Sequence, residues 1–215
     1  MKKILIIDAH EIVREGLKRI LDEQSGAKVI GEASAAPEAL KLTRERDWDV
    51  AVLGFPLDGE RGLEALKELK RIRPKMPVLI LSMHSEEQYA RRSFKAGAAG
   101  YITKDAPRGE LLRAIDKVIE GGRYVSAALA ETLSADLARG TDRPPHEALS
   151  DREFEVLRWI GSGKTVGEIA NLLSLSDKTV STYRARLLEK MGLKTNAQLI
   201  RYAIHNKLVD PLDEY

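Results

Sequence analysis

The chain has 215 residues, of which 32% are charged, and its 35 Lys and Arg nearly balance its 33 Asp and Glu, for a net charge of +2. This length suits one large domain or two small ones. A net charge this close to zero does not by itself indicate a nucleic-acid binder. Because there is no cysteine and no apolar run of about 18 residues or more, disulfides, thiolate metal sites and membrane spans are excluded, and we expect a soluble cytoplasmic protein with no membrane partner.

The first 120 residues alternate short apolar strands with amphipathic helices. We expect strands at Lys3–Asp8, Lys28–Glu32, Val50–Leu53, Val78–Leu81 and Gly100–Ile102, and helices at Glu11–Gln24, Pro37–Arg46, Leu63–Ile72, Glu86–Ala96 and Gly109–Ile119. In the first helix the residues expected to point inward are Ile12, Leu17, Ile20 and Leu21. Strands this apolar, separated by helices, indicate a parallel five-stranded sheet covered on both faces. We therefore predict a doubly wound α/β domain of flavodoxin type over residues 1–122.

A site is expected at the carboxyl ends of these strands, where doubly wound sheets bind their ligands. Asp8 and Ala9 follow the first strand, Gly54 the third, Ser82 the fourth and Lys104 the fifth. The four histidines of the chain show no ligand-like spacing, so the sequence predicts neither a histidine metal site nor a cofactor.

Residues 123–148 are predicted to link two domains. Val125–Leu137 is compatible with a helix, and Arg139–Glu147 (RGTDRPPHE) is expected to be a flexible polar linker. The second domain is predicted over residues 149–209, and residues 210–215 (DPLDEY) form an acidic tail.

The second domain is predicted to contain four helices. The first follows Ser150, with Glu153 as its capping-box partner. The second spans Thr165–Leu173, and a tight connection through Ser174 leads to the third helix, which is basic. Two helices joined in this way are typical of a helix-turn-helix motif. A fourth helix at Asn196–Asn206 has Leu199, Ile200, Ala203 and Ile204 along one side and completes an all-α domain.

The third helix, Ser176–Leu193, combines an apolar stripe with a polar, basic face. The stripe consists of Val180, Tyr183, Leu187 and Met191, three and four residues apart. An ordinary amphipathic surface helix would show the same stripe, but residues 176–194 also carry five basic against two acidic side chains. Small side chains allow close approach to base edges and cations reach phosphates, which suits the major groove of double-stranded DNA. The expected base-edge residues are Ser181, Thr182 and Ala185, the expected phosphate-binding residues are Lys178, Arg184, Arg186 and Lys190, and Thr179 lies among them.

The motifs LSDREFEVL, EIANLLSLS, KTVSTYRARLLEKMGL and AQLIRYA make residues 149–209 resemble the LuxR-type DNA-binding domain. This resemblance implies a sequence-specific transcription regulator whose last helix forms dimers. Carried over to this chain, the dimer contact would be an apolar patch of Leu199, Tyr202 and Ala203. Because small interfaces are typically transient, we expect a weak homodimer.

The motifs IIDAHEIVREGL, DVAVLGFPLDGERGLEAL and LILSMHSEEQYARRSFKAGAAGYITKDAP make the first domain resemble a response-regulator receiver. The whole chain is thus similar to the NarL/FixJ family of two-component regulators. The resemblance implies that a phosphoryl group is taken onto an aspartate with Mg²⁺ held by that aspartate and an acidic pair. It matches Asp8 with the first acid of the pair, Ser82 with the hydroxyl switch, Tyr101 with the aromatic switch and Lys104 with the phosphoryl-binding lysine.

Two positions depart from this pattern, since the acceptor position is Gly54 and the second acid is Ala9. Only Asp8 remains of three acids, so we predict that the receiver binds no Mg²⁺ and accepts no phosphoryl group. Ser82 and Tyr101 are then expected to be packing residues, and Asp8 is expected to pair with Lys104.

Two alternatives remain open at this point. In the first, the chain is a conventional regulator that a sensor kinase phosphorylates at another acceptor, such as Asp58. In the second, its receiver holds a small anion beside Lys104, in the space vacated at Ala9 and Gly54. Another protein partner at the receiver is compatible with either reading. No catalytic constellation is present, so an enzyme is not predicted.

Overall fold

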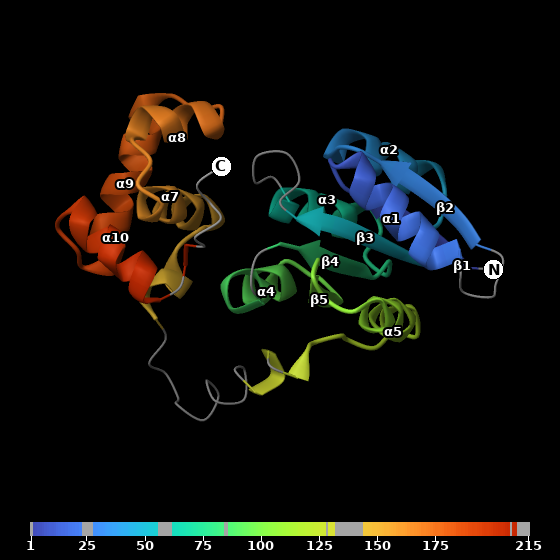
Figure 1. Cartoon of the computed structure of the whole chain (residues 1–215). Helices are drawn as coiled ribbons and strands as arrows, with labels where there is room; N and C mark the ends of the chain where they lie inside the picture. The colour runs from blue at the N-terminus through green and yellow to red at the C-terminus, as the bar shows by residue number, and fades with distance from the viewer. Residues whose placement is uncertain are drawn as a thin grey trace. The chain divides into compact units, whose positions relative to one another are not determined.

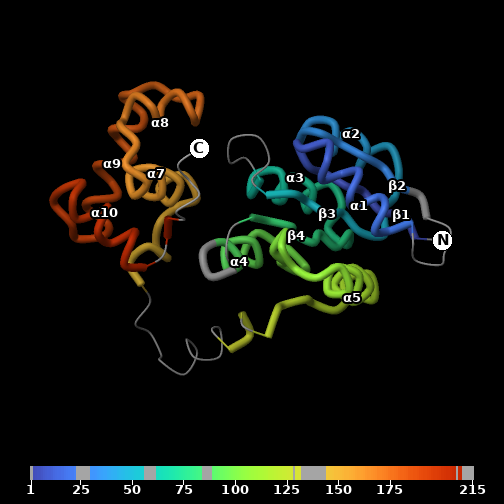
Figure 2. The backbone as a smooth tube through the Cα atoms, in the orientation of Figure 1, coloured from blue at the N-terminus to red at the C-terminus, as the bar shows by residue number. Residues whose placement is uncertain are grey.

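The computed structural model of the chain describes residues 2–22, 28–55, 62–83, 86–127, 129–131, 144–206 and 208–209. It consists of two compact units, residues 1–134 and 135–215 (Figures 1 and 2). Each unit has buried apolar residues of its own. No helix in the described ranges is both long enough and apolar enough to cross a membrane.

The first unit is built on a five-stranded parallel sheet in the order β2-β1-β3-β4-β5. Its strands are β1 (Lys2–Ile7), β2 (Lys28–Ala33), β3 (Val50–Phe55), β4 (Val78–Ser82) and β5 (Gly100–Thr103). Every residue of β3 and β4 is buried, as expected of central strands that are apolar throughout. The predicted doubly wound sheet is confirmed.

Helices cover both faces of this sheet (Figure 1). They are α1 (Glu11–Asp22), α2 (Ala36–Glu45), α3 (Gly62–Ile72), α4 (Glu86–Lys95) and α5 (Arg108–Ile119). Leu17 and Leu21 of α1 share a buried cluster with Leu111 and Ile115 of α5 and with alternate residues of the strands. The other strand residues, such as Leu5 and Leu53, are equally buried, and α2, α3 and α4 follow one another in contact. Strand residues that point to either face of the sheet are therefore buried under helices.

One inward position of α1 was predicted wrongly. Ile12 is 83% exposed, whereas Val13 packs against the core cluster. Val13 lies four residues before Leu17, which puts the two side chains on one face, while Ile12 lies five residues before it. Helical spacing from the buried leucines therefore selects Val13.

The second unit consists of α7 (Asp151–Gly161), α8 (Val166–Leu172), α9 (Asp177–Met191) and α10 (Asn196–His205). The capping box of Ser150 and Glu153 is present as predicted. Gly192 ends α9 at φ 63°, the left-handed conformation that glycine adopts without strain. The predicted four-helix domain is confirmed.

The end of the predicted linker has regular structure. Residues Pro145–Ala148 form a 3₁₀ helix, η1, preceded by Pro144. Successive prolines fix φ near the helical value and favour such a turn. The His146 ring then packs edge-on against Tyr202 of α10, and its Nδ1 lies 2.8 Å from the Tyr202 hydroxyl. Pro144–Glu147 is therefore not flexible linker. Residues 127 and 129–131 of the predicted linking helix are helical, whereas residues 125 and 126 are not, and residues 128 and 132–137 lie outside the described residues.

The predicted dimer patch on α10 is also corrected. Leu199 and Ala203 are completely buried, because these residues, four apart, face α7. Tyr202 is half-buried and bonded to His146, so the three residues cannot form an exposed patch. Ile204, predicted to lie along the same side of the helix as Leu199 and Ala203, is instead 60% exposed.

Candidate receiver site and candidate nucleic-acid interface

Asp8 forms the centre of the site at the strand ends. It follows β1, and only 2% of its surface is exposed. Its Oδ2 accepts a hydrogen bond from Nζ of Lys104 at 2.6 Å. Its Oδ1 accepts one from the His10 backbone N–H at 2.9 Å and lies 3.1 Å from Nδ1 of the His10 ring. Both carboxylate oxygens are thus engaged within the chain, and the predicted pairing of Asp8 with Lys104 is confirmed.

Gly54 permits this pairing. In the register of β1 and β3, Ile7 lies opposite Leu53, so Asp8 comes beside Gly54. A Cβ atom added at Gly54 would lie 1.9 Å from Oδ2 of Asp8 and 2.6 Å from its Cγ. The Asp8 carboxylate therefore occupies the space that any side chain at position 54 would need. The space predicted to be vacant beside Lys104 is filled, which argues against a small anion there.

Lys104 contacts Asp8 although it follows β5, a strand at the edge of the sheet. In the sheet β5 is separated from β1 by β3 and β4, and the side chain of Lys104, which follows β5, nevertheless contacts Asp8, which follows β1. Only 12% of this side chain is exposed, and its backbone N–H donates to the carbonyl of Ser82 at 2.7 Å. The contact ties the turn after β5 to the end of β1.

Arg14 contributes to the site and was not predicted from the sequence. Its guanidinium donates to the backbone carbonyl of Asp8 at 2.8 Å and to that of Ala9 at 3.3 Å. Its Nε lies 3.6 Å from the carboxylate of Glu32 on β2. Arg14 thus fixes the loop after β1. The only signal in the sequence was a basic residue in the first turns of a helix that begins just after this loop.

Ser82 and Tyr101 are both completely buried. Ser82 ends β4 and Tyr101 lies in β5, paired with Ile80. Such burial suits packing residues, which is the role expected of them.

The residues at this site do not fit a Mg²⁺ ion. Mg²⁺ requires several oxygen ligands in near-octahedral geometry, and carboxylates usually supply one or two. Ala9 and Gly54 offer no side-chain oxygen, and Asp8 already binds Lys104 and His10. Within the described ranges there is no group of three or more acidic or histidine side chains that could hold a metal. No phosphoryl-transfer step follows from this arrangement.

The second unit contains the helix-turn-helix. Between α8 and α9, Ser174 has a φ of 51°, the left-handed conformation that reverses the chain, and Leu175 N–H donates to the carbonyl of Ala170 at 2.8 Å. Ile169, Ala170 and Leu173 face inward as predicted, and the buried side of α9 consists of Val180, Leu187 and Met191, with Tyr183 partly buried.

The opposite side of α9 carries the predicted DNA-binding residues. Lys178, Ser181, Thr182, Ala185, Arg186 and Lys190 are exposed, and Thr179 and Arg184 are half-buried. Some of these side chains form hydrogen bonds within the second unit. The Thr179 hydroxyl lies 2.8 Å from that of the cap residue Ser176, and Nε of Arg184 donates to Oδ1 of Asn196 at 2.5 Å. Ser181, Thr182 and Ala185 stand on one exposed face, as access to base edges requires.

Lys190 has a partner that was not predicted. Its Nζ donates to Oε2 of Glu153 at 2.7 Å, and the same oxygen accepts the backbone N–H of Ser150 at 2.8 Å. Burial raises the pKa of Glu153, but the hydrogen bonds from Lys190 and Ser150 outweigh burial, so the net pKa lies below its ordinary value of 4.5. Glu153 therefore joins the start of α7 to the last turn of α9.

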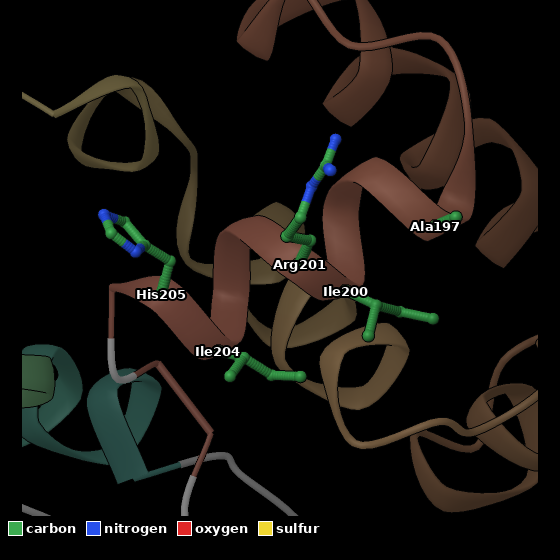
Figure 3. Close-up of a pocket in the computed structure, with 5 residues that line it drawn as sticks. All are labelled: Ala197, Ile200, Arg201, Ile204 and His205. Atoms are coloured by element: carbon green, nitrogen blue, oxygen red, sulfur yellow. The ribbon is translucent and has the colours of Figure 1, made fainter.

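An exposed apolar surface lies on the outer side of α10. Ala197, Ile200, Arg201, Ile204 and His205 line a shallow hollow there. Figure 3 shows Ile200 and Ile204 on the same side of the helix, one turn apart. We call these five residues the α10 outer surface.

Comparison with known proteins assigns both units. A family model described as "Response regulator receiver domain" matches residues 4–116, and one described as "Bacterial regulatory proteins, luxR family" matches residues 147–203. The response regulator GacA of Pseudomonas aeruginosa is 36% identical over 211 residues, which cover 98% of this chain and 99% of GacA. The response regulator UvrY of Escherichia coli K12 is 34% identical, over 97% of this chain and 96% of UvrY. The solved structure of RcsB from Salmonella enterica serovar Typhimurium, bound to promoter rprA with the phosphomimetic BeF3−, has 25% identity and a TM-score of 0.66, covering 94% of this chain and 98% of that one.

The contact at Gly54 generates a stability prediction. Gly54→Ala should destabilise the first unit by roughly 1–3 kcal/mol, because the new methyl group must displace the Asp8 carboxylate or distort β3. Urea unfolding followed at Trp48, in a Trp159→Phe background, measures this effect. Gly109→Ala is the matched control, since a Cβ there meets nothing within 4 Å. A Gly54→Ala protein as stable as this control would contradict the assignment.

The lowered pKa of Glu153 generates a pH prediction. A carboxyl group with a depressed folded pKa stabilises the fold above its unfolded pKa, near 4.5, and loses this contribution as the pH falls through the folded value. The second unit, followed at Trp159 in a Trp48→Phe background, should thus lose stability below about pH 4.5. In Glu153→Gln this part of the acid sensitivity should disappear. An identical pH profile in the two proteins would refute the account of Glu153.

Proposed function

Because the chain belongs to the NarL/FixJ response regulators, which join a receiver to a LuxR-type DNA-binding domain, we propose that it regulates transcription without phosphorylation of its receiver. It is a DNA-binding transcription regulator by family. The observation that carries the proposal is the contact between Asp8 and Lys104 across the bare Cα of Gly54.

Three features of the receiver support this proposal. Gly54 has no side chain that could accept a phosphoryl group. Lys104, which would contact the phosphoryl oxygens in the family, is neutralised by Asp8 at 2.6 Å. The one remaining acid, Asp8, is buried and doubly engaged, so a metal would have to break its existing contacts before binding.

A conventional, kinase-controlled regulator remains the second candidate, and it needs another acceptor. Asp58 was the residue considered for that role, and it lies outside the described residues. A sensor kinase is therefore a partner of this chain only if such an acceptor exists. We assign no enzymatic activity to the chain, and we place its action in the cytoplasm, where bacterial DNA lies.

The proposed DNA interface is the exposed side of α9. We assign base-edge contacts to Ser181, Thr182 and Ala185, whose short side chains allow a close approach. Lys178 and Arg186 are exposed cations suited to phosphates. In the same family, RcsB has been solved bound to a promoter. Here double-stranded DNA is the corresponding partner, in a site that two copies of the domain share.

The α10 outer surface is the proposed dimer contact, in place of the buried patch predicted from the sequence. Ile200 and Ile204 lie one turn apart, and Ile204 is largely exposed. A surface this small gives weak association in solution. Two adjacent half-sites on DNA raise the effective concentration of one copy beside the other, so pairing is expected there.

Intact mass measurement tests the receiver. After incubation with acetyl phosphate and Mg²⁺, the mass of the chain should be unchanged, because the acceptor position is Gly54 and Lys104 is paired with Asp8. A response regulator that retains the acceptor aspartate, treated in parallel, verifies the donor. A gain of one phosphoryl group mapped to the first unit would overturn the proposal and identify the acceptor.

Gel shifts on one and two half-sites test the dimer. Ile204→Asp should remove the gain in affinity that the protein shows on the two-half-site duplex relative to a single half-site. For a weak contact we expect this loss to be about tenfold, or 1.4 kcal/mol. Affinity for a single half-site should be unchanged. Ile12→Asp, at an exposed isoleucine of the first unit, is the matched control. Retained cooperativity in Ile204→Asp would exclude this surface.

A further inference from the structure

Oε2 of Glu153 makes two contacts that join different helices. It accepts the backbone N–H of Ser150, which caps α7, and it accepts Nζ of Lys190, in the last turn of α9. Only 2% of Glu153 is exposed, whereas the Lys190 side chain is 43% exposed. A carboxylate this deeply buried needs its cation, because an unpaired buried charge is strongly unfavourable.

The contact has consequences for the orientation of α9. The buried side of this helix packs through Val180, Leu187 and Met191, and apolar contacts are not directional. A charged hydrogen bond is directional, and it acts here at the end of the helix opposite to its Ser176 cap. The Lys190 contact therefore restricts rotation of α9 about its axis, which decides where Ser181 and Thr182 point.

We propose that Lys190 is a positioning residue for DNA recognition, held by Glu153 so that α9 presents Ser181, Thr182 and Ala185, and that it does not neutralise a phosphate. This inference rests on the proposed DNA interface and reassigns Lys190, which the sequence predicted to bind phosphate. Transfer of the ammonium group from Glu153 to a phosphate would leave the buried Glu153 carboxylate with its hydrogen bonds to Ser150 but without a cation. Lys178, by contrast, is exposed and has no ion-pair partner among the described residues.

Salt dependence separates the two roles. Each phosphate that a protein neutralises contributes about 0.9 to the slope of log affinity against log salt on duplex DNA. A positioning residue contributes nothing to this slope but changes the preference for the correct sequence. A residue that serves stability alone changes neither quantity while the protein remains folded.

The experiment uses the full chain and two duplexes. One duplex is selected from a random-sequence library with the wild-type protein, and the other is a scrambled version of the same length. Affinities are measured between 50 and 200 mM salt, an interval of about this size being enough to define the slope. The variants are Lys190→Met, Lys190→Arg, Glu153→Gln, the double variant of Lys190→Met with Glu153→Gln and, as the matched phosphate control, Lys178→Met. Circular dichroism verifies that each variant is folded at the assay temperature.

We expect Lys190→Met to bind the selected duplex about tenfold more weakly, the equivalent of one good base contact, with an unchanged salt slope and unchanged affinity for the scrambled duplex. Glu153→Gln, which keeps the cap but loses the charge, should behave alike, and the double variant should lose no more than either single variant. Lys190→Arg should restore most of the affinity. Lys178→Met should weaken both duplexes and lower the slope by about 0.9.

A Lys190→Met protein with a slope lowered like that of Lys178→Met would overturn the proposal, since Lys190 would then contact phosphate. A folded Lys190→Met protein with wild-type affinity on both duplexes would also overturn it, and would leave Lys190 a purely structural role. Failure of the wild-type protein to select any duplex would instead refute the DNA interface itself, so the two failures are distinguishable.

Discussion

The contact between Asp8 and Lys104 is the interaction on which this receiver depends. It lies where the family carries out phosphoryl transfer, and it uses two of the residues that the chemistry would need. Gly54 makes the contact sterically possible, because even a methyl group there would overlap the Asp8 carboxylate. The Asp8 carboxylate in this position and a side chain at position 54 therefore exclude one another. The pair links the end of β1 to the turn after β5, in a protein that otherwise keeps the family fold.

The second unit also contains a buried carboxylate that is paired with a lysine. Glu153 is as deeply buried as Asp8, and again a lysine from a distant element compensates its charge. In the receiver the pair closes a site, whereas in the helix-turn-helix it holds the recognition helix against its support. In the receiver, removal of Lys104 would leave the buried Asp8 carboxylate without its cation, a change that typically costs about 3–5 kcal/mol. The cost at Glu153 should be smaller, because the Lys190 side chain is 43% exposed and water screens the pair. Each pair is therefore a strong constraint on local geometry, whatever its net contribution to stability.

The sequence predicted the fold well because its signals there are local. Apolar strands, caps such as Ser150 and the glycine at position 192 each specify their own element, and the strand order follows from the family topology. The pairing of Asp8 with Lys104 was also predictable, since parallel strand ends converge. Features that depend on the rotation of a helix about its own axis were not predictable from the sequence. Ile12 was placed inward, and Leu199 and Ala203 were placed in an exposed patch, although both of these are buried against α7. The ion pair of Lys190 with Glu153 was also missed, because a basic residue at a helix end has no local feature in the sequence that indicates an internal partner. Arg14 was missed because its acceptors are backbone carbonyls, which no sequence pattern identifies.

The central claim is that the receiver is fixed by its own ion pair, so that DNA binding does not respond to a phosphodonor. The most direct measurement is the affinity of the full chain for a two-half-site duplex in the presence of Mg²⁺, with and without acetyl phosphate. The account predicts one affinity and one degree of cooperativity under both conditions. Tighter or more cooperative binding only when acetyl phosphate is present would contradict it.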